Sequence, residues 1–275
     1  MKKSMIALGA ATLCAAVSFA DVQSANIVGY AQTTPENAAG YSFIIPTFKD
    51  VAAKTATYDL QNIKLVGAYG DGGTDAIIVY NEFAALTGDF YYWGTVEDSA
   101  GDMEYAVDGW YNGMYGDELV ENITLPLGTG LYLNLSSYSS GAKVQYSGEV
   151  YQNQLEQDIP NAGYNMIGNS TPVPVDLQDI KLVGAYGDGG TDAIIVYNEF
   201  AALTGDFYYW GTVEDSAGDM EYAVDGWYNG MYGTDLVEGV VLQPGQGLYL
   251  NLSAYSFANS PKLVLPNPME KKSED

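Results

Sequence analysis

The sequence predicts an all-β protein with two tandem antiparallel β-sandwich or partly open barrel domains, produced by internal duplication. Two observations support this fold class. Residues 63–116 and 180–233 are identical over 54 residues, at an offset of 117 (180 − 63). Apolar and polar residues alternate at period two in several segments, and 32 glycines provide for many tight turns.

Residues 1–20 have the composition of a secretory signal peptide. Lys2 and Lys3 precede an apolar run over residues 5–17, and small residues follow at a predicted cleavage point near Ala20. We therefore expect a secreted protein, or one held in the periplasm or at the cell surface. No second long apolar run appears, so the mature chain is expected to have no transmembrane segment.

The first predicted domain comprises residues 21–145, and its strands are predicted in order along the chain. Residues 41–45 form an apolar stretch, and residues 76–80 suit a central strand that is covered on both faces. Residues 90–93 and 131–135 are two further strands, the latter with leucine at every second position. Between them, the Asn-Gly pair at 112–113 predicts a hairpin.

The second predicted domain comprises residues 146–265 and repeats the same strand pattern. Residues 248–252 alternate as residues 131–135 do, and residues 262–265 match the closing strand at 144–146. The remaining residues, 266–275, contain two prolines and a charged end, and they are expected to be disordered.

Short motifs resemble those of a bacterial protein family. Residues 24–30 follow the signal peptide, a Gly-Tyr pair starts a strand at 40–41 and 163–164, and Pro-Gly-x-Gly occurs at 244–247. In these features the chain is similar to uncharacterised secreted all-β tandem-repeat proteins of the planctomycete/verrucomicrobia bacterial group. The resemblance implies secretion and a β fold, and it implies no catalytic residues.

The charge excludes several function classes. The formal net charge is −25, with 35 acidic residues, ten lysines, no arginine and no histidine. Nucleic acid is an unexpected partner because its phosphates require a basic surface. Removal of residues 1–20 takes the charge to −27 (8 − 35) and also removes the lone cysteine. A mature chain without histidine or cysteine cannot build the usual nucleophilic triads or zinc sites.

Acidic residues cluster in the duplicated segment and could bind calcium, whose ligands are carboxylate and carbonyl oxygens. The alternative is a solvated acidic surface with Asp-Gly turns. The candidate calcium ligands are Asp71, Asp75, Glu97, Asp98 and Asp102, with their copies Asp188, Asp192, Glu214, Asp215 and Asp219.

All four tryptophans also lie in the duplicated segment, together with many of the 24 tyrosines. One side of residues 90–93 should face the core, and the other could form an exposed platform for sugars or a protein partner. The candidate aromatic face comprises Tyr91, Trp93, Trp110, Tyr111 and Tyr115, with their copies Tyr208, Trp210, Trp227, Tyr228 and Tyr232. Core packing is the alternative for the tyrosines, and it is the favoured interpretation for Trp93 and Trp110.

The predicted function is a secreted, non-catalytic binding or structural module that presents a duplicated acidic, tyrosine-rich face. Its expected partner is an extracellular glycan or a surface protein. One alternative is a calcium-dependent carbohydrate-binding protein. A second is a glycoside hydrolase that uses carboxylates alone, for which Asp89 and Asp108 are the candidates.

Overall fold

The protein is an all-β structure, which confirms this part of the predicted fold class. The computed structural model is 48% strand, and its small sheets are arranged like a four-bladed propeller. The division into two tandem domains stays a prediction. The structure describes residues 27–35, 37–51, 53–69, 71–82, 87–96, 105, 107–185, 188–199, 204–213 and 222–270.

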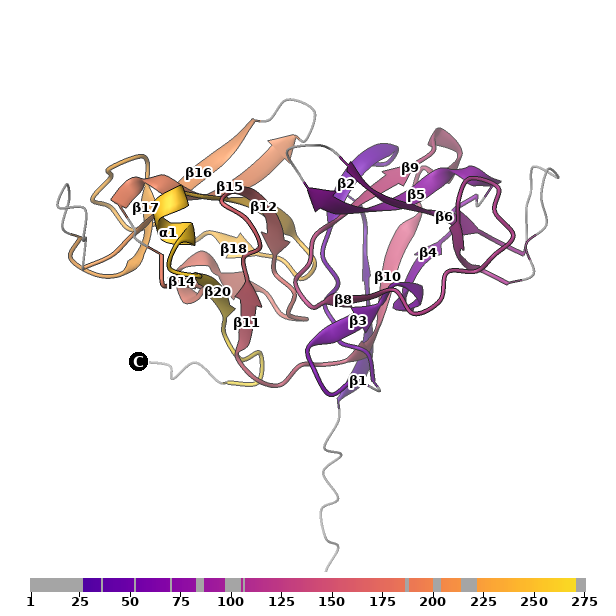
Figure 1. The fold of residues 1–275 in the computed structure, drawn as a ribbon, viewed down its shortest axis with the longest axis horizontal. Helices are drawn as coiled ribbons and strands as arrows, with labels where there is room; N and C mark the ends of the chain where they lie inside the picture. Colours follow the sequence, from indigo (N-terminus) through magenta and orange to yellow (C-terminus); the bar gives the residue numbers. More distant parts are fainter. Residues whose placement is uncertain are drawn as a thin grey trace, which may run out of the picture.

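The first half of the chain forms three antiparallel sheets, which lie on the right in Figure 1. The largest has the strand order β2 (Gly40–Ile44), β9 (Leu131–Leu135), β5 (Asp71–Glu82), β6 (Thr87–Gly94) and β7 (Gly109–Asn112). A second has the order β1 (Val28–Thr33), β10 (Lys143–Glu149) and β4 (Ile63–Val66). The third pairs β3 (Thr57–Asp59) with β8 (Thr124–Pro126).

The second half repeats this topology on the left of the same view. Its five-stranded order is β12 (Gly163–Gly168), β19 (Gly247–Leu252), β15 (Asp188–Glu199), β16 (Thr204–Gly211) and β17 (Gly226–Asn229). The smaller sheets are β11 (Leu155–Asp158), β20 (Lys262–Leu265) and β14 (Lys181–Val183), and β13 (Val175–Asp176) with β18 (Val241–Leu242).

Short helical turns join some of these strands. The 3-10 turns η1 (Leu60–Asn62) and η4 (Leu177–Asp179) are equivalent in the two halves. The turn η3 (Ser137–Ser139) corresponds to the one-turn helix α1 (Ala254–Phe257). No helix of the described residues is long and apolar enough to cross a membrane.

The core lies on one face of each five-stranded sheet. Leu131, Leu133 and Leu135 of β9 point into it, as the period-two pattern predicts. The strand β5 is the central strand of its sheet, and Ala76–Val79 are buried, as expected for a strand covered on both faces. The main buried cluster includes residues of both halves, so it is continuous through the molecule.

The Asn-Gly pair begins a wider return than a two-residue hairpin. The chain leaves β7 at Asn112, and the backbone N–H of Asn112 donates to the carbonyl of Glu118 at 3.0 Å. Residues 113–117 therefore form the loop. At the other end of the chain, residues 266–270 contain a hydrogen-bonded turn at Asn267. The predicted signal peptide and residues 271–275 lie outside the described residues.

Candidate functional site

The predicted aromatic face is wrong, because most of its members are core residues. Tyr115 and Tyr232 are exposed and Tyr208 is half-buried. The other seven are buried: Tyr91, Trp93, Trp110, Tyr111, Trp210, Trp227 and Tyr228.

Hydrogen bonding explains why some of these aromatic residues can be buried, although the buried Trp93 and Trp210 indole N–H groups have no acceptor among the described residues. The Trp110 indole Nε1 donates to the Ile63 carbonyl at 2.6 Å, and the Tyr111 hydroxyl donates to the Val107 carbonyl at 2.7 Å. Their polar atoms therefore need no water. Gln61 also fixes β7, because its Nε2 donates to the carbonyls of Trp110 and Val120.

The two exposed tyrosines do not belong to the sheet face. Tyr115 and Tyr232 lie in the loops after β7 and β17, with left-handed φ angles of 58° and 57°. A side chain in such a loop is not aligned with those of the sheet. The ten predicted residues therefore form no common surface.

Asp75 and Asp192 are structural carboxylates and are buried, and their oxygen atoms bind the protein's own donors rather than the predicted calcium ion. The Asp75 Oδ1 atom accepts from the Ser136 N–H at 2.7 Å, and its Oδ2 atom accepts from the Ser139 hydroxyl. Asp192 makes the same bonds to Ser253 and Ser256. Each carboxylate thus holds the turn that follows a core strand.

The remaining calcium candidates cannot be assigned to a site. Asp71 and Asp188 begin β5 and β15, but the positions of their side chains are not described. The described residues contain no group of three or more potential metal ligands. Outside the described residues lie Glu97, Asp98, Asp102, Glu214, Asp215 and Asp219.

A different aromatic row lies on the outer face of the first five-stranded sheet. The ladder pairs Tyr41 with Asn134, Asn134 with Ala76, and Ala76 with Tyr92. Directly paired residues share a face, so these four side chains form one row across four strands, in which Ala76 is buried. The row continues to the predicted Tyr111 of β7, which is buried beneath Tyr105. Tyr41 is 44% exposed, and Asn134 and Tyr92 are half-buried. We call the first four residues the first outer row.

The second half carries the same row at equivalent positions. Tyr164 pairs with Asn251, Asn251 with Ala193, and Ala193 with Tyr209. Tyr164 is also 44% exposed. Tyr41 and Asn134 lie outside the 54 identical residues, yet the second outer row has tyrosine and asparagine at these places.

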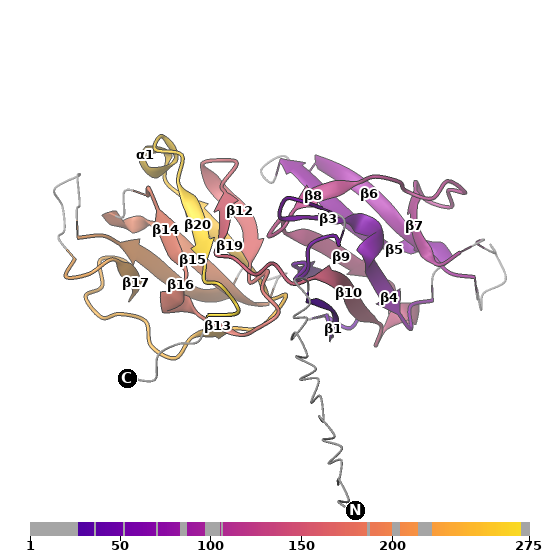
Figure 2. The same ribbon diagram turned by 90° about the horizontal axis from the view of Figure 1, so that it is seen from below.

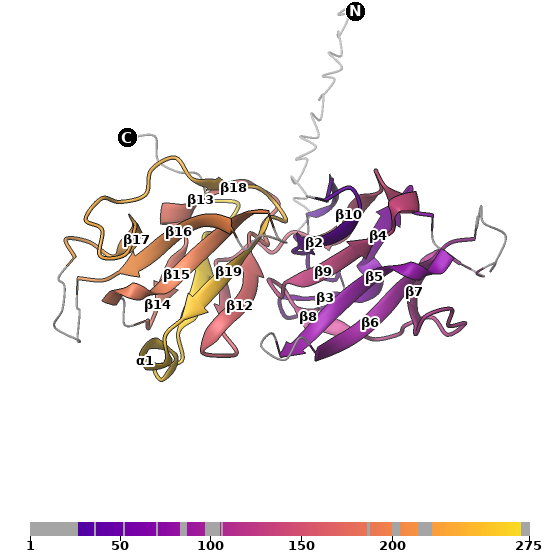
Figure 3. The same ribbon diagram turned by 90° about the horizontal axis from the view of Figure 1, so that it is seen from above.

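On the same face of each sheet, the row of side chains next to the outer row joins the two halves. Ile78 and Tyr132 of the first sheet form one buried cluster with Ile195 and Tyr249 of the second. Phe43 stacks on Tyr249, with ring centroids 5.4 Å apart and an interplanar angle of 12°. In Figures 1 and 3, β2 and β12 lie next to each other at the middle of the molecule, and Figure 2 shows the same two halves from below. The outer rows therefore flank this contact.

The outer rows contain no charged side chain and no acid or base. Strands lie about 4.8 Å apart, so the backbones of Tyr41 and Tyr92, three strands apart, are about 14 Å apart. Two phenol rings at this spacing, with an amide between them, can stack on apolar ring faces and hydrogen-bond to hydroxyl groups. This arrangement suits binding rather than catalysis.

Sequence reasoning missed these rows because cross-strand register is needed to find them. The only local signal is the shared Gly-Tyr start of β2 and β12. Gly40 and Gly163 have φ angles of 87° and 84°, which favour glycine, and each places the next tyrosine on the outer face. Comparison with known proteins finds no matching family model and no similar curated sequence.

Proposed function

We propose that the protein is a secreted, non-catalytic binding module that presents the same uncharged tyrosine–asparagine row twice. The observation that carries this proposal is the presence of a half-exposed row in each half, with Tyr41 and Asn134 matched by Tyr164 and Asn251 outside the identical segment. The Tyr41 ring packs edge-on against Tyr132, with centroids 6.5 Å apart, and keeps 44% of its surface exposed, so both structural packing and ligand contact are open to it. The recurrence of this half-exposed tyrosine in both diverged segments supports a role in binding.

The ligand that fits this surface is a neutral polysaccharide. The mature chain is strongly acidic, so polyanions are repelled, whereas the outer rows themselves are uncharged. A polymer with a repeated unit can engage both rows at once, which raises its apparent affinity through effective concentration. A surface protein is the competing partner, and it would not require two equivalent rows.

The two candidate acids of the glycoside hydrolase alternative do not form a catalytic pair with each other. Asp89 lies near the start of β6, paired with Val79, whereas Asp108 precedes Gly109, which pairs with Gly94 at the end of β6. Five residues of strand separate these positions by about 16 Å. Hydrolases that use two carboxylates hold them about 5–10 Å apart. These two acids are therefore too far apart to act as a pair.

Adsorption to insoluble neutral polysaccharides tests the proposal. Cellulose, chitin, mannan and xylan would be incubated with the mature protein and with the double variant Tyr41→Ala/Tyr164→Ala. We expect adsorption to at least one polysaccharide, and its loss in this variant. The matched control is Tyr138→Ala/Tyr255→Ala, which removes two more exposed tyrosines away from the rows. No adsorption by the unaltered protein, or equal loss in both variants, would contradict the proposal.

The same assay in EDTA separates this proposal from the calcium-dependent alternative. The outer rows contain no carboxylate, and Asp75 and Asp192 are occupied by hydrogen bonds within the fold. We therefore expect unchanged adsorption after EDTA. Loss in EDTA that calcium restores would support the calcium-dependent alternative instead.

A further inference from the structure

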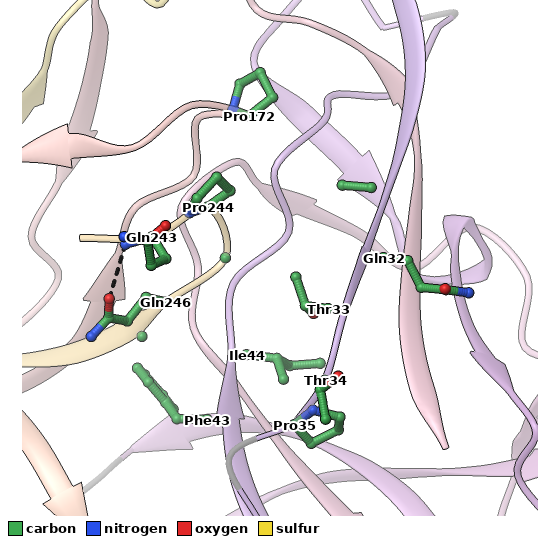
Figure 4. Close-up of a pocket in the computed structure, with 13 residues that line it drawn as sticks. Gln32, Thr33, Thr34, Pro35, Phe43, Ile44, Pro172, Gln243, Pro244 and Gln246 are labelled. Atoms are coloured by element: carbon green, nitrogen blue, oxygen red, sulfur yellow. Dashed lines mark hydrogen bonds between the residues drawn. The ribbon is translucent and has the colours of Figure 1, made fainter. Parts of the chain in front are cut away.

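A groove of about 650 Å³ lies between the two halves, and its lining includes none of the residues of the outer rows. One wall is the end of β1 with the residues that follow it, and the other is the loop over residues 243–247 (Figure 4). Phe43, Ile44 and Pro172 complete the lining. Its volume lies within the range of small-ligand sites, about 300–1,000 Å³.

The two halves meet through equivalent loops, since Gly128 lies against Gln157 of the second half and Gly245 lies near Thr33 of the first, so the groove has a counterpart. Thr33 pairs with Val144, which pairs in turn with Leu65. In the second half, Gln157 pairs with Leu263, which pairs with Leu182, the copy of Leu65. Thr33 and Gln157 therefore occupy equivalent positions. By the same register, Ala31 corresponds to Leu155. The loop before β19 corresponds to the loop before β9, with Pro244 matching Leu127.

The counterpart is closed. Next to two of the equivalent residues, Leu127 and Leu155, lies a space of only about 10 Å³. Gln157 fills the position beside Gly128, where a Cβ atom would overlap it, and its Nε2 donates to the Ser170 hydroxyl at 3.0 Å. The open groove has smaller residues at the three equivalent positions: Ala31 in place of Leu155, Thr33 in place of Gln157, and Pro244 in place of Leu127. Three size differences thus distinguish an open site from a packed one.

The lining of the groove defines the chemistry of its ligand. It contains no charged residue in an otherwise acidic protein. Gln243 and Gln246 supply amides, and Thr33 and Thr34 supply hydroxyls. The Gln246 Oε1 atom already accepts from the Gln243 N–H at 2.9 Å, which leaves its amide NH2 group to donate. The Gln32 side chain points away from the loop wall (Figure 4). Phe43 and the prolines supply apolar surface. This combination complements a molecule with many hydroxyl groups and no charge.

The loop wall presents side chains rather than free backbone groups. The Gly245 N–H donates to the Asn169 carbonyl at 2.9 Å, and the Gly245 carbonyl accepts from the Ile45 N–H at 3.3 Å. The Gln246 N–H donates to the Gln243 carbonyl at 3.0 Å. An extended peptide, which binds mainly through backbone hydrogen bonds, finds few partners on this wall.

We propose that the groove is a binding site for a short, neutral oligosaccharide, separate from the outer rows. Isothermal titration with short gluco-, manno-, xylo- and N-acetylglucosamine oligosaccharides tests it. We expect at least one to bind, and a short oligogalacturonide to bind at least tenfold more weakly because the acidic protein repels it.

Variants at the groove and its counterpart identify the site. Thr33→Gln places the residue of the closed counterpart in the groove, and we expect it to weaken binding at least tenfold. Gln246→Ala, which removes one amide, should weaken binding without filling the space. The matched control, Gln157→Thr, changes the equivalent position on the closed side and should leave affinity unchanged.

Two outcomes would overturn the proposal. One is that no neutral oligosaccharide binds. The other is that binding survives Thr33→Gln and Gln246→Ala but is lost in Tyr41→Ala/Tyr164→Ala, which would assign it to the outer rows. Polysaccharide adsorption that persists while the groove variants lose oligosaccharide affinity would support both sites independently.

Discussion

Asp75 illustrates at the residue scale how a surface-type residue can be part of the core. Its carboxylate is inaccessible to solvent and accepts hydrogen bonds from Ser136 and Ser139. The Ser139 hydroxyl oxygen also accepts from the Tyr69 N–H at 2.7 Å. One carboxylate thus connects a core strand, a turn and the loop after β4.

Replacing Asp75 with alanine should destabilise the fold by about 2–4 kcal/mol, because it leaves buried donors unsatisfied. Asp75→Asn should cost less, since an amide oxygen can still accept one of the bonds. Urea unfolding measures both, and Asp192→Ala is the matched variant in the second half. A loss below about 0.5 kcal/mol for Asp75→Ala would show that the carboxylate is not holding the turn.

Two buried phenols predict a loss of stability at alkaline pH. Burial raises the pKa of Tyr58 and of Tyr146 above the ordinary tyrosine value. Since the unfolded chain ionises first, their contribution is complete below about pH 10 and is lost as the pH rises toward the folded-state values. Urea unfolding from pH 8 to 11.5 should show this decline, and Tyr146→Phe should reduce its slope. An unchanged slope in this variant would contradict the assignment.

At the scale of the strand, the sequence pattern predicts which segments form strands better than it predicts which side of each strand faces the core. Residues 76–80, 90–93 and 131–135 lie in strands as predicted. The alternation within residues 90–93 was also correct, but the side assigned to solvent is the core side. Both sides of this strand are aromatic, so the local pattern does not distinguish them. Only pairing with β5 and β7 shows that Tyr91 and Trp93 face inward.

The glycines near the junction of the halves can be recognised in the sequence as a Gly-x-Gly motif. Why glycine is needed there becomes clear only from the packing of the two halves. At Gly247 a Cβ atom would overlap the Phe43 ring of the other half. Gly130 is similarly close to Phe43 and Met166. The Gly-x-Gly pattern therefore allows each loop to approach the opposite sheet.

Gly247→Ala should destabilise the protein by about 1–3 kcal/mol through overpacking at this junction. Phe43→Ala removes the ring that the new methyl group meets. The double variant should therefore lose less stability than the sum of the two single losses. Thermal or urea unfolding of the three variants measures the difference, and strict additivity would mean that the two residues do not meet.

For the whole molecule, the continuous core predicts that the two halves unfold together. The main buried cluster contains residues of both, and a second cluster joins their outer faces. Calorimetry of the mature chain should show a single transition whose calorimetric and van't Hoff enthalpies agree. Two resolved transitions would instead indicate two independent domains, as the duplication alone suggests.

The duplication also sets the most direct test of the binding function. The affinity for an immobilised neutral polysaccharide would be measured for the unaltered chain, Tyr41→Ala, Tyr164→Ala and the double variant. Two equivalent rows predict that each single variant binds at least tenfold more weakly than the unaltered chain, that the two singles match, and that the double variant does not bind. Equal affinity of the unaltered chain and the double variant would contradict the account.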